Sequence, residues 1–374
     1  MKTRITLALL SCMTALLLPA AAWEQAQPDY PWQFPQDHWP HDAYRTEWWY
    51  FTGQVTDKQT PAHRFGFQFT FFRIGVVEEP LPLDSNWVTT HLIMGHAALT
   101  DITAGKHYFS EMLYRDIPLF VTRGKSPGPL ILRSQPPAGT EQNWTLQFDD
   151  GQFTFEMADR KQGIAFHLDF QPTKPLVFQG PGGYSVKSET EASASLYYSF
   201  TRAKVAGSVR VAGRTHEVTG SAWMDREFAS NHLAENQIGW DWFSLQLEDG
   251  RDLMIYQLRS AGDRVDYATG TLVAVDGTPR YLKRDAWRLD VTRHRTSPAT
   301  NGRYPVGWRL ALPDQGLDLR IVPLLDAQEN VSRLIPGLAY WEGAVELHDA
   351  DGRVTGQGYV ELTGYVPGGR LPLE

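Results

Sequence analysis

The sequence has 374 residues, a formal net charge of −8 at pH 7, 13 tryptophans and a single cysteine. This length is enough for two domains of ordinary size. An acidic chain without a basic tract argues against nucleic acid and against adhesion to anionic membrane surfaces as partners. Aromatic residues make up 12 % of the chain, which is typical of a thick core or a wide apolar cavity.

The first 22 residues are typical of a secretory signal peptide. Lys2 and Arg4 form a basic N-terminal region, and residues 5–18 form an apolar segment that is too short to span a bilayer comfortably. Small residues that suit signal peptidase follow and end at Ala22. We expect cleavage near Ala22, a periplasmic or secreted protein, and a charge that changes from −8 to −10 with the loss of Lys2 and Arg4. The alternative is a lipobox, "LLSC", with lipidation on Cys12, but the apolar run continues past this residue. Cleavage also removes the cysteine, which leaves no disulfide and no thiolate metal site. No later segment is predicted to cross a membrane.

Residues 23–43 ("QPDYPWQFPQDHWPHD" and flanks) are rich in proline and aromatic residues and predict an extended arm on the domain surface. From Tyr44 onward, short alternating runs are separated by turn signals. Asp-Gly steps in "WTLQFDDGQFTFEMA", "FSLQLEDGRDLMIYQLR" and "AVELHDADGRVTGQGYVEL" are strong hairpin signals. Helical periodicity is scarce, and its best candidate, residues 327–334, is short. We therefore predict an all-β protein built from sandwiches or barrels.

A weak internal repeat divides the chain. "WWYFTGQV" (48–55) resembles "WDWFSLQL" (240–247), and "VTGSAWMD" (218–225) resembles "VTGQGYVE" (354–361). Each half therefore begins with an aromatic strand and ends with a Val-Thr-Gly strand. We predict an N-terminal domain over 44–232 and a C-terminal domain over 233–374. The cleft between two domains is a preferred place for a ligand.

Four apolar strand faces each carry one ionisable group near an end, because residues two apart in a strand share a face. These groups and their neighbours are Glu47 (with Trp49 and Phe51), Arg73 (with Phe67, Phe69 and Phe71), Asp241 (with Phe243, Leu245 and Leu247) and Asp225 (with Trp223, repeated as Glu361 with Tyr359). Burying a charge is costly unless it is paired. One interpretation is a set of ion pairs that close the barrel ends, such as Arg73 with Asp225 or Glu227. The other is a water-poor cavity in which a carboxylic acid has a raised pKa and donates a proton.

The stretch "AWMDREF" (222–228) places three adjacent charges, Asp225, Arg226 and Glu227, between aromatic residues. A solvated turn is the simplest interpretation of such a run. Alternation instead sends Asp225 and Trp223 to one face, which we expect to be a cavity or interface, and Arg226 to the other, which we expect to be solvent.

A two-residue turn at the Asp-Gly step 249–250 would place Phe243 opposite Tyr256 and Trp240 opposite Arg259. Asp241 then lies diagonally near Tyr256 on one face. An acid beside a phenol either steers a proton or forms a satisfied core hydrogen bond.

Standard catalytic motifs are missing from the sequence: it has no G-x-S-x-G elbow, no H-E-x-x-H, no P-loop and no G-x-G-x-x-G. His91 and His96 are five residues apart, so on one strand they point to opposite faces. We predict neither a metal site nor a cofactor.

The sequence resembles a known family in five motifs. They are "EWWYFTG" (47–53), "FGFQFTFFR" (65–73), "HAALTD" (96–101), "GSAWMDREF" (220–228) and "GWDWFSLQLEDGRDLMIYQLR" (239–259). These motifs are similar to those of the AttH-like family of secreted proteins, which is related to carotenoid 1,2-hydratases and often labelled "predicted secreted hydrolase". The resemblance implies two lipocalin-like antiparallel β-barrels packed together. It also implies a link to cofactor-free hydration of an isolated double bond, and a place beside ABC-transporter permeases in envelope lipid handling.

Three functions follow as alternatives. The first is binding of an apolar, lipid- or isoprenoid-like ligand, the second is a hydratase or hydrolase of such a molecule, and the third is a scaffold for an envelope transporter. In an enzyme, Asp225 is the expected proton donor, Trp223 would stabilise a carbocation, and Asp241 and Tyr256 are second choices. The expected ligand-binding residues are Glu47, Trp49, Phe51, Arg73, Trp223, Arg226, Glu227, Trp240 and Trp242.

Overall fold

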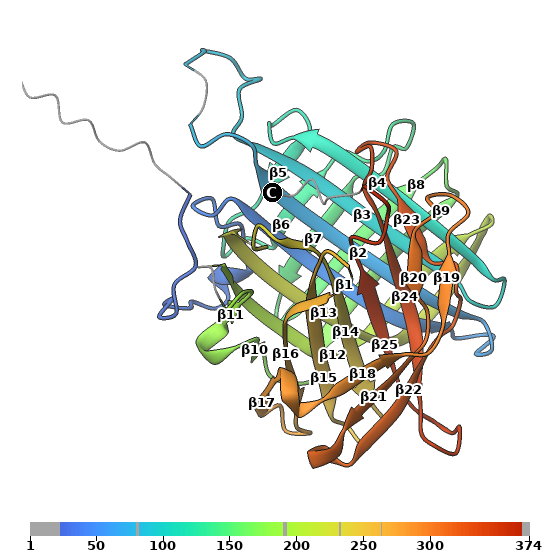
Figure 1. The fold of residues 1–374 in the computed structure, drawn as a ribbon. Helices are drawn as coiled ribbons and strands as arrows, with labels where there is room; N and C mark the ends of the chain where they lie inside the picture. The colour runs from blue at the N-terminus through green and yellow to red at the C-terminus, as the bar shows by residue number, and fades with distance from the viewer. Residues whose placement is uncertain (1–22, 80–81, 190–192, 232, 263, 369–374) are drawn as a thin grey trace, which may run out of the picture.

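The computed structural model describes residues 23–79, 82–189, 193–231, 233–262 and 264–368. Its strands form two large antiparallel sheets and one small two-stranded sheet (Figure 1). The predicted fold class, all-β with two lipocalin-like antiparallel barrels packed together, is confirmed. The predicted signal peptide and Cys12 lie outside the described residues.

The larger sheet, which we call barrel A, has the strand order β4-β3-β2-β1-β13-β12-β9-β8-β7-β6-β5, with β10 and β11 paired to β12. It curls into a nearly closed barrel. Its strands are β1 (Thr46–Asp57), β2 (Arg64–Gly75), β3 (His91–Asp101), β4 (Lys106–Arg115), β5 (Val121–Arg123), β6 (Leu130–Ser134), β7 (Trp144–Asp149), β8 (Gln152–Asp159), β9 (Ile164–Pro172), β10 (Val177–Phe178), β11 (Tyr184–Val186), β12 (Ala194–Val211) and β13 (Arg214–Asn231).

The second large sheet, barrel B, has the order β17-β16-β15-β14-β25-β24-β22-β21-β18, with β23 paired to β24. Its strands are β14 (Gln237–Leu247), β15 (Asp252–Ser260), β16 (Arg264–Val273), β17 (Pro279–Lys283), β18 (Arg288–Val291), β21 (Trp308–Leu312), β22 (Leu317–Pro323), β23 (Glu329–Val331), β24 (Ala339–His348) and β25 (Val354–Leu362). The small sheet pairs β19 (His294–Thr296) with β20 (Arg303–Pro305), and the short 3-10 helices are η1 (Gln36–His38), η2 (Pro181–Gly183), η3 (Arg284–Ala286) and η4 (Pro313–Gln315). The weak helical expectation for 327–334 is wrong, because β23 lies there.

The internal repeat corresponds to the strands that join the two barrels. The first repeat unit forms β1 and β13, which pair in barrel A, and the second forms β14 and β25, which pair in barrel B. Strand β1 contacts β25, and β2 contacts β24, so the barrels pack through these strands (Figure 1). The domain limits at 232 and 233 stay a prediction; the described strands of barrel A all precede that point and those of barrel B all follow it.

Strand β1 is buried on both faces. Trp49 and Phe51 point into the core of barrel A. Tyr50, between them, joins a second cluster with residues of barrel B such as Trp242, whose ring centroid lies 5.3 Å away. Both faces of β1 are aromatic because one fills a barrel and the other meets the partner barrel.

Most of the N-terminal arm is exposed or half-buried, as expected for a segment on the domain surface, but part of it also packs into barrel A. Trp39 is 5 % exposed and belongs to the core of barrel A. The carbonyl of His38 accepts a hydrogen bond from the indole of Trp49 at 2.7 Å. The arm therefore covers one end of barrel A.

Beneath the arm lies a buried ion network. Glu47 pairs with both Arg73 and Arg226, and all three side chains are fully buried. The guanidinium of Arg226 also lies 4.0 Å from the ring centroid of Trp49. Two expectations are corrected here. Arg73 pairs with Glu47 rather than with Asp225 or Glu227, and Arg226 faces the barrel interior rather than solvent.

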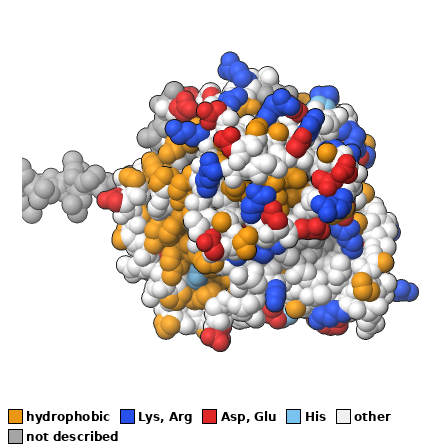
Figure 2. All heavy atoms as spheres, turned by 90° about the horizontal axis from the view of Figure 1, so that it is seen from below, with side chains coloured by type: hydrophobic (Ala, Val, Ile, Leu, Met, Phe, Trp, Pro, Cys, Tyr) orange, Lys and Arg blue, Asp and Glu red, His pale blue; other side chains and the backbone are white. Residues whose placement is uncertain are grey.

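Figure 2 shows the face seen from below. Acidic and basic side chains are interspersed over it, and hydrophobic side chains gather at one side. Among the described residues, no helix has the length and apolar character needed to cross a membrane.

Candidate functional site

A pocket lies between the two barrels, with an empty volume of about 1070 Å³ that includes space open to solvent at its mouth. Most of its wall is aromatic or aliphatic. It is lined by Trp48, Tyr50, Phe72, Met94, His96, Lys187, Tyr197, Asp225, Glu227, Leu233, Trp240, Trp242, Tyr256, Leu258, Leu338, Tyr340, Glu361 and Thr363. Such a mixture, a mainly apolar wall with a few convergent polar groups, is typical of small-molecule sites.

The internal repeat builds opposite walls of this pocket from matching positions. In barrel A, Tyr50 lies opposite Asp225 in the β1–β13 register. In barrel B, Trp242 lies opposite Glu361 in the β14–β25 register. The repeat aligns Tyr50 with Trp242 and Asp225 with Glu361. Each barrel therefore contributes an aromatic residue and a carboxyl group from equivalent places.

Asp225 is 3 % exposed and accepts three hydrogen bonds. The hydroxyl of Tyr197 donates to Oδ2 at 2.6 Å, while the hydroxyl of Ser199 and the indole N–H of Trp223, at 2.6 Å, donate to Oδ1. Burial raises the pKa of Asp225 to about 7, against the lowering effect of these donors. Near neutral pH this carboxyl group is therefore present in both protonation states.

Lys187 provides the positive charge of the site. Its Nζ lies 2.7 Å from Oε1 of Glu227 and 4.7 Å from the ring centroid of Tyr256. Burial acts to lower the pKa of Lys187, but the neighbouring Glu227 and Tyr256 leave it raised. The ammonium group is therefore charged and paired, and Glu227 is held as its counter-ion.

A second carboxyl group, that of Glu361, borders the pocket from barrel B. Burial raises its pKa to about 7, and the nearby Asp225 and Glu227 add to the rise. Its strand neighbour Glu342 receives a hydrogen bond from the Tyr50 hydroxyl at 2.7 Å. Burial and the charge of Glu361 raise the pKa of Glu342 well above its usual range.

His96 reaches the pocket from β3. Its Nδ1 lies 2.6 Å from the hydroxyl of Tyr340, and burial lowers the pKa of the imidazole to about 3. Its Nε2 is buried and has no hydrogen-bond partner among the residues that the structure describes. A neutral histidine with an unsatisfied ring nitrogen offers a polar contact to a ligand.

Of the predicted site residues, Asp225, Glu227, Trp240, Trp242 and Tyr256 line the pocket. Trp223 does not line the pocket, but its indole N–H donates a hydrogen bond to Asp225, which does. The other predicted ligand-binding residues do not line it, because they belong to the interior and end of barrel A. These are Glu47, Trp49, Phe51, Arg73 and Arg226.

The expected pairing of Asp241 with Tyr256 is wrong. Tyr256 lies opposite Trp242, one residue away from the predicted register. The turn is longer than two residues, since Leu247 N–H bonds to the carbonyl of Arg251. Asp241 instead pairs with Arg259 at 2.9 Å, away from the pocket.

Five pocket-lining residues were not predicted from the sequence: Lys187, Tyr197, His96, Tyr340 and Tyr50. Lys187 and Tyr197 come from the region before and within β12, which carries no repeat signal. Glu361 could have been selected, because the repeat aligns it with Asp225.

The comparisons place this architecture in a family. The model of the AttH-like family matches residues 25–365. The chain belongs to the AttH-like family. A crystal structure of an AttH protein from Nitrosomonas europaea is 32 % identical to this AttH-like chain and superposes with a TM-score of 0.78, covering 92 % of this chain and all of that one.

More distant solved structures share the fold of this AttH-like protein. Kievitone hydratase from Nectria haematococca is 14 % identical, with a TM-score of 0.64 over 93 % of this chain and 98 % of that one. CghA, solved with Sch210972, is 13 % identical, with a TM-score of 0.50 over 86 % of this chain and 89 % of that one. No curated protein matches the chain in sequence.

The raised pKa of Asp225 has a consequence for stability. Between the ordinary value of 3.8 and about 7 the folded state keeps a proton that the unfolded chain has lost, so folding weakens as pH rises through this window. Asp225→Asn has no such proton. We expect the stability of this variant relative to wild type to increase from pH 4 to pH 8, by at most about 4 kcal/mol.

Urea unfolding of both proteins at several pH values measures this difference. The exposed Asp285, changed to Asn, is the control for loss of a carboxyl group away from the pocket. A difference between Asp225→Asn and wild type that stays constant with pH would contradict the raised pKa.

Proposed function

We propose that this AttH-like protein binds an apolar small molecule in the pocket between its barrels. The observation that carries the proposal is the wall of the pocket, in which aromatic side chains from both repeats surround a few buried polar groups. Aromatic faces bind extended apolar or polyene chains through large contact areas. The polar groups Lys187, Asp225 and Glu361 would hold a polar end or a double bond in one orientation.

Native mass spectrometry of the mature protein, purified without detergent, tests this proposal. We expect a bound lipid, isoprenoid or polyene that solvent extraction releases and identifies. A protein that flies at its bare mass and remains bare after incubation with lipid extract would favour the scaffold alternative instead.

Trp240 allows a sharper test with a matched control. It lines the pocket, whereas Trp87 is 53 % exposed and lies outside the pocket wall. With retinol as a fluorescent polyene probe, we expect Trp240→Ala to weaken binding by about 10- to 100-fold, since a tryptophan contact contributes on the order of 2 kcal/mol. Trp87→Ala should bind like wild type. If wild type, Trp240→Ala and Trp87→Ala bind retinol with equal affinity, retinol binds outside this pocket.

A second function, hydration of a double bond, is favoured by the position of Asp225. Its pKa of about 7 makes it an acid that still holds a proton near neutral pH inside an apolar wall. In the proposed step, protonated Asp225 gives its proton to one alkene carbon. A water oxygen bonds to the other carbon, and a water proton returns to the carboxylate, so that one water is added in total and no cofactor is used. The shared fold with kievitone hydratase is in keeping with this step.

Incubation in H₂¹⁸O tests the hydration step directly. The substrate is the compound extracted from the protein, or else lycopene as an acyclic polyene. We expect a product heavier by one H₂¹⁸O, formed more slowly as pH rises through about 7 and Asp225 loses its proton. If the substrate binds but no product gains mass across this pH range, binding is the only one of the two functions that remains supported.

We also propose a periplasmic or secreted location and an envelope role beside an ABC-transporter permease. Both rest on the leader-like first 22 residues and on the family resemblance. Fractionation of cells that express the full chain, followed by N-terminal sequencing, tests the location. A protein that starts at Met1 and stays in the cytoplasm would refute it.

A further inference from the structure

At the end of barrel A opposite the buried ion network, polar side chains gather on the inward face of the sheet. Asp57 ends β1 on the face that begins with Glu47, and His63 lies just before β2 on the face of Phe65. His216, near the start of β13, lies two residues before the core residue Val218. Strand alternation therefore brings one carboxylate and two imidazoles to the same barrel end.

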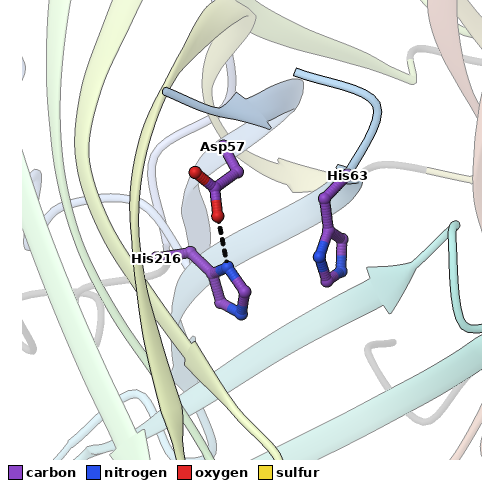
Figure 3. A group of neighbouring side chains, drawn as sticks. All are labelled: Asp57, His63 and His216. Atoms are coloured by element: carbon purple, nitrogen blue, oxygen red, sulfur yellow. Dashed lines mark hydrogen bonds and ion pairs between the residues drawn. The ribbon is translucent and has the colours of Figure 1, made fainter. Parts of the chain in front are cut away.

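These three side chains converge closely. One potential ligand atom from each of Asp57, His63 and His216 lies within 4.8 Å of the others. Nδ1 of His216 lies 2.6 Å from Oδ2 of Asp57. Figure 3 shows this contact as a dashed line, with the ring of His63 beside it. The two imidazole centroids are 4.7 Å apart, and the ring of His63 stacks on Phe65.

The surroundings hold these groups in place. Nε2 of His63 lies 3.0 Å from Oδ1 of Asp101, the last residue of β3. Oδ1 of Asp57 accepts backbone hydrogen bonds from Gln59 at 2.7 Å and Thr60 at 3.1 Å. A carboxylate that orients a histidine ring is a common support around protein metal sites.

We propose that Asp57, His63 and His216 bind one divalent transition-metal ion of the zinc type, with Asp101 positioning His63. Two imidazoles and one carboxylate match the ligand preference of Zn²⁺, whereas Ca²⁺ and Mg²⁺ favour oxygen ligands alone. The ion would fasten the β1–β2 hairpin to β13. This site is separate from the ligand pocket, since seven residues of extended strand, roughly 23 Å, separate Tyr50 from Asp57.

Isothermal titration of the chelator-treated full-length mature protein with ZnCl₂, after removal of any histidine tag, tests the proposal. We expect one ion per chain. His216→Ala and His63→Ala should each weaken binding by about 100-fold or more, and Asp101→Asn by about 10- to 100-fold. His167→Ala, which removes an exposed histidine, should bind like wild type.

Thermal unfolding provides a second measurement that does not depend on any enzyme activity. Zn²⁺ should raise the unfolding temperature of wild type and of His167→Ala but not that of His216→Ala. If His216→Ala fails to fold, Asp57→Asn replaces it in both measurements. Absence of zinc binding by wild type, or wild-type zinc affinity in both His63→Ala and His216→Ala, would overturn the proposal.

Discussion

Replacing Glu47 with Gln should lower the free energy of unfolding by about 3 to 5 kcal/mol at neutral pH, as breaking a buried ion pair on one side typically does. Glu47 is fully buried between Arg73 and Arg226. Burial alone would raise the pKa of Glu47, but these guanidinium groups hold it well below its usual range. Glutamine keeps the shape of the side chain but removes the buried charge that both guanidinium groups share, and the exposed Asp42, 3.9 Å from Nε of Arg73, replaces it poorly.

Urea unfolding of Glu47→Gln and wild type at pH 7 measures this loss. Glu141→Gln is the matched control, because Glu141 is exposed and should change stability by less than about 0.5 kcal/mol. The pH dependence of the free energy of unfolding follows from the lowered pKa of Glu47. Its contribution is present above its unfolded value, and it is lost as pH falls through the folded value. The difference in the free energy of unfolding between wild type and Glu47→Gln should therefore become smaller in strong acid. A loss below about 1 kcal/mol at pH 7 would mean that the arginines find other partners.

Replacing Asp225 with Asn should slow hydration by about 100- to 10,000-fold, as removal of a general acid typically does. Asparagine is nearly isosteric, but it has no proton to give to an alkene. The apolar wall around it is unchanged, so retinol should bind Asp225→Asn with nearly the affinity of wild type. The ¹⁸O incorporation rate and the probe affinity, measured on the same preparation, separate chemistry from binding.

The control for this variant is Trp240→Ala, which should weaken binding instead. Three outcomes distinguish the proposed functions. Loss of ¹⁸O incorporation with retained binding supports Asp225 as the proton donor. Full turnover by Asp225→Asn would refute that role. Glu361, whose pKa is also about 7, would then be the next candidate for the proton donor. Loss of probe binding in Asp225→Asn would mean that the carboxyl group holds the ligand rather than protonating it.

The internal repeat shows how much of the fold and of the site could be predicted from the sequence. Hairpin signals and alternation predicted an all-β chain, and the matching of 48–55 with 240–247 and of 218–225 with 354–361 pointed to two related halves. These segments are the strands that meet between the barrels. Asp225 was identified as a buried acid because it shares a face with Trp223, and the structure places it at the pocket wall.

The tertiary structure alone decided which face of each strand meets the pocket. Alternation groups Trp49 with Phe51 and Trp48 with Tyr50, but both faces of β1 are aromatic, so hydrophobicity cannot tell the barrel interior from the interface. The same ambiguity placed Arg226 in solvent, although it is buried against Trp49.

Long-range assembly decided the remaining parts of both sites. Lys187 meets Glu227, and His216 meets Asp57, across 40 and 159 residues of chain, and no local pattern marks these partners. The register of β14 and β15 depended on one extra residue in the turn, which moved Asp241 away from Tyr256. Local sequence patterns therefore determined the strands and which residues share a face, while packing between distant strands determined what each face meets and which charges pair.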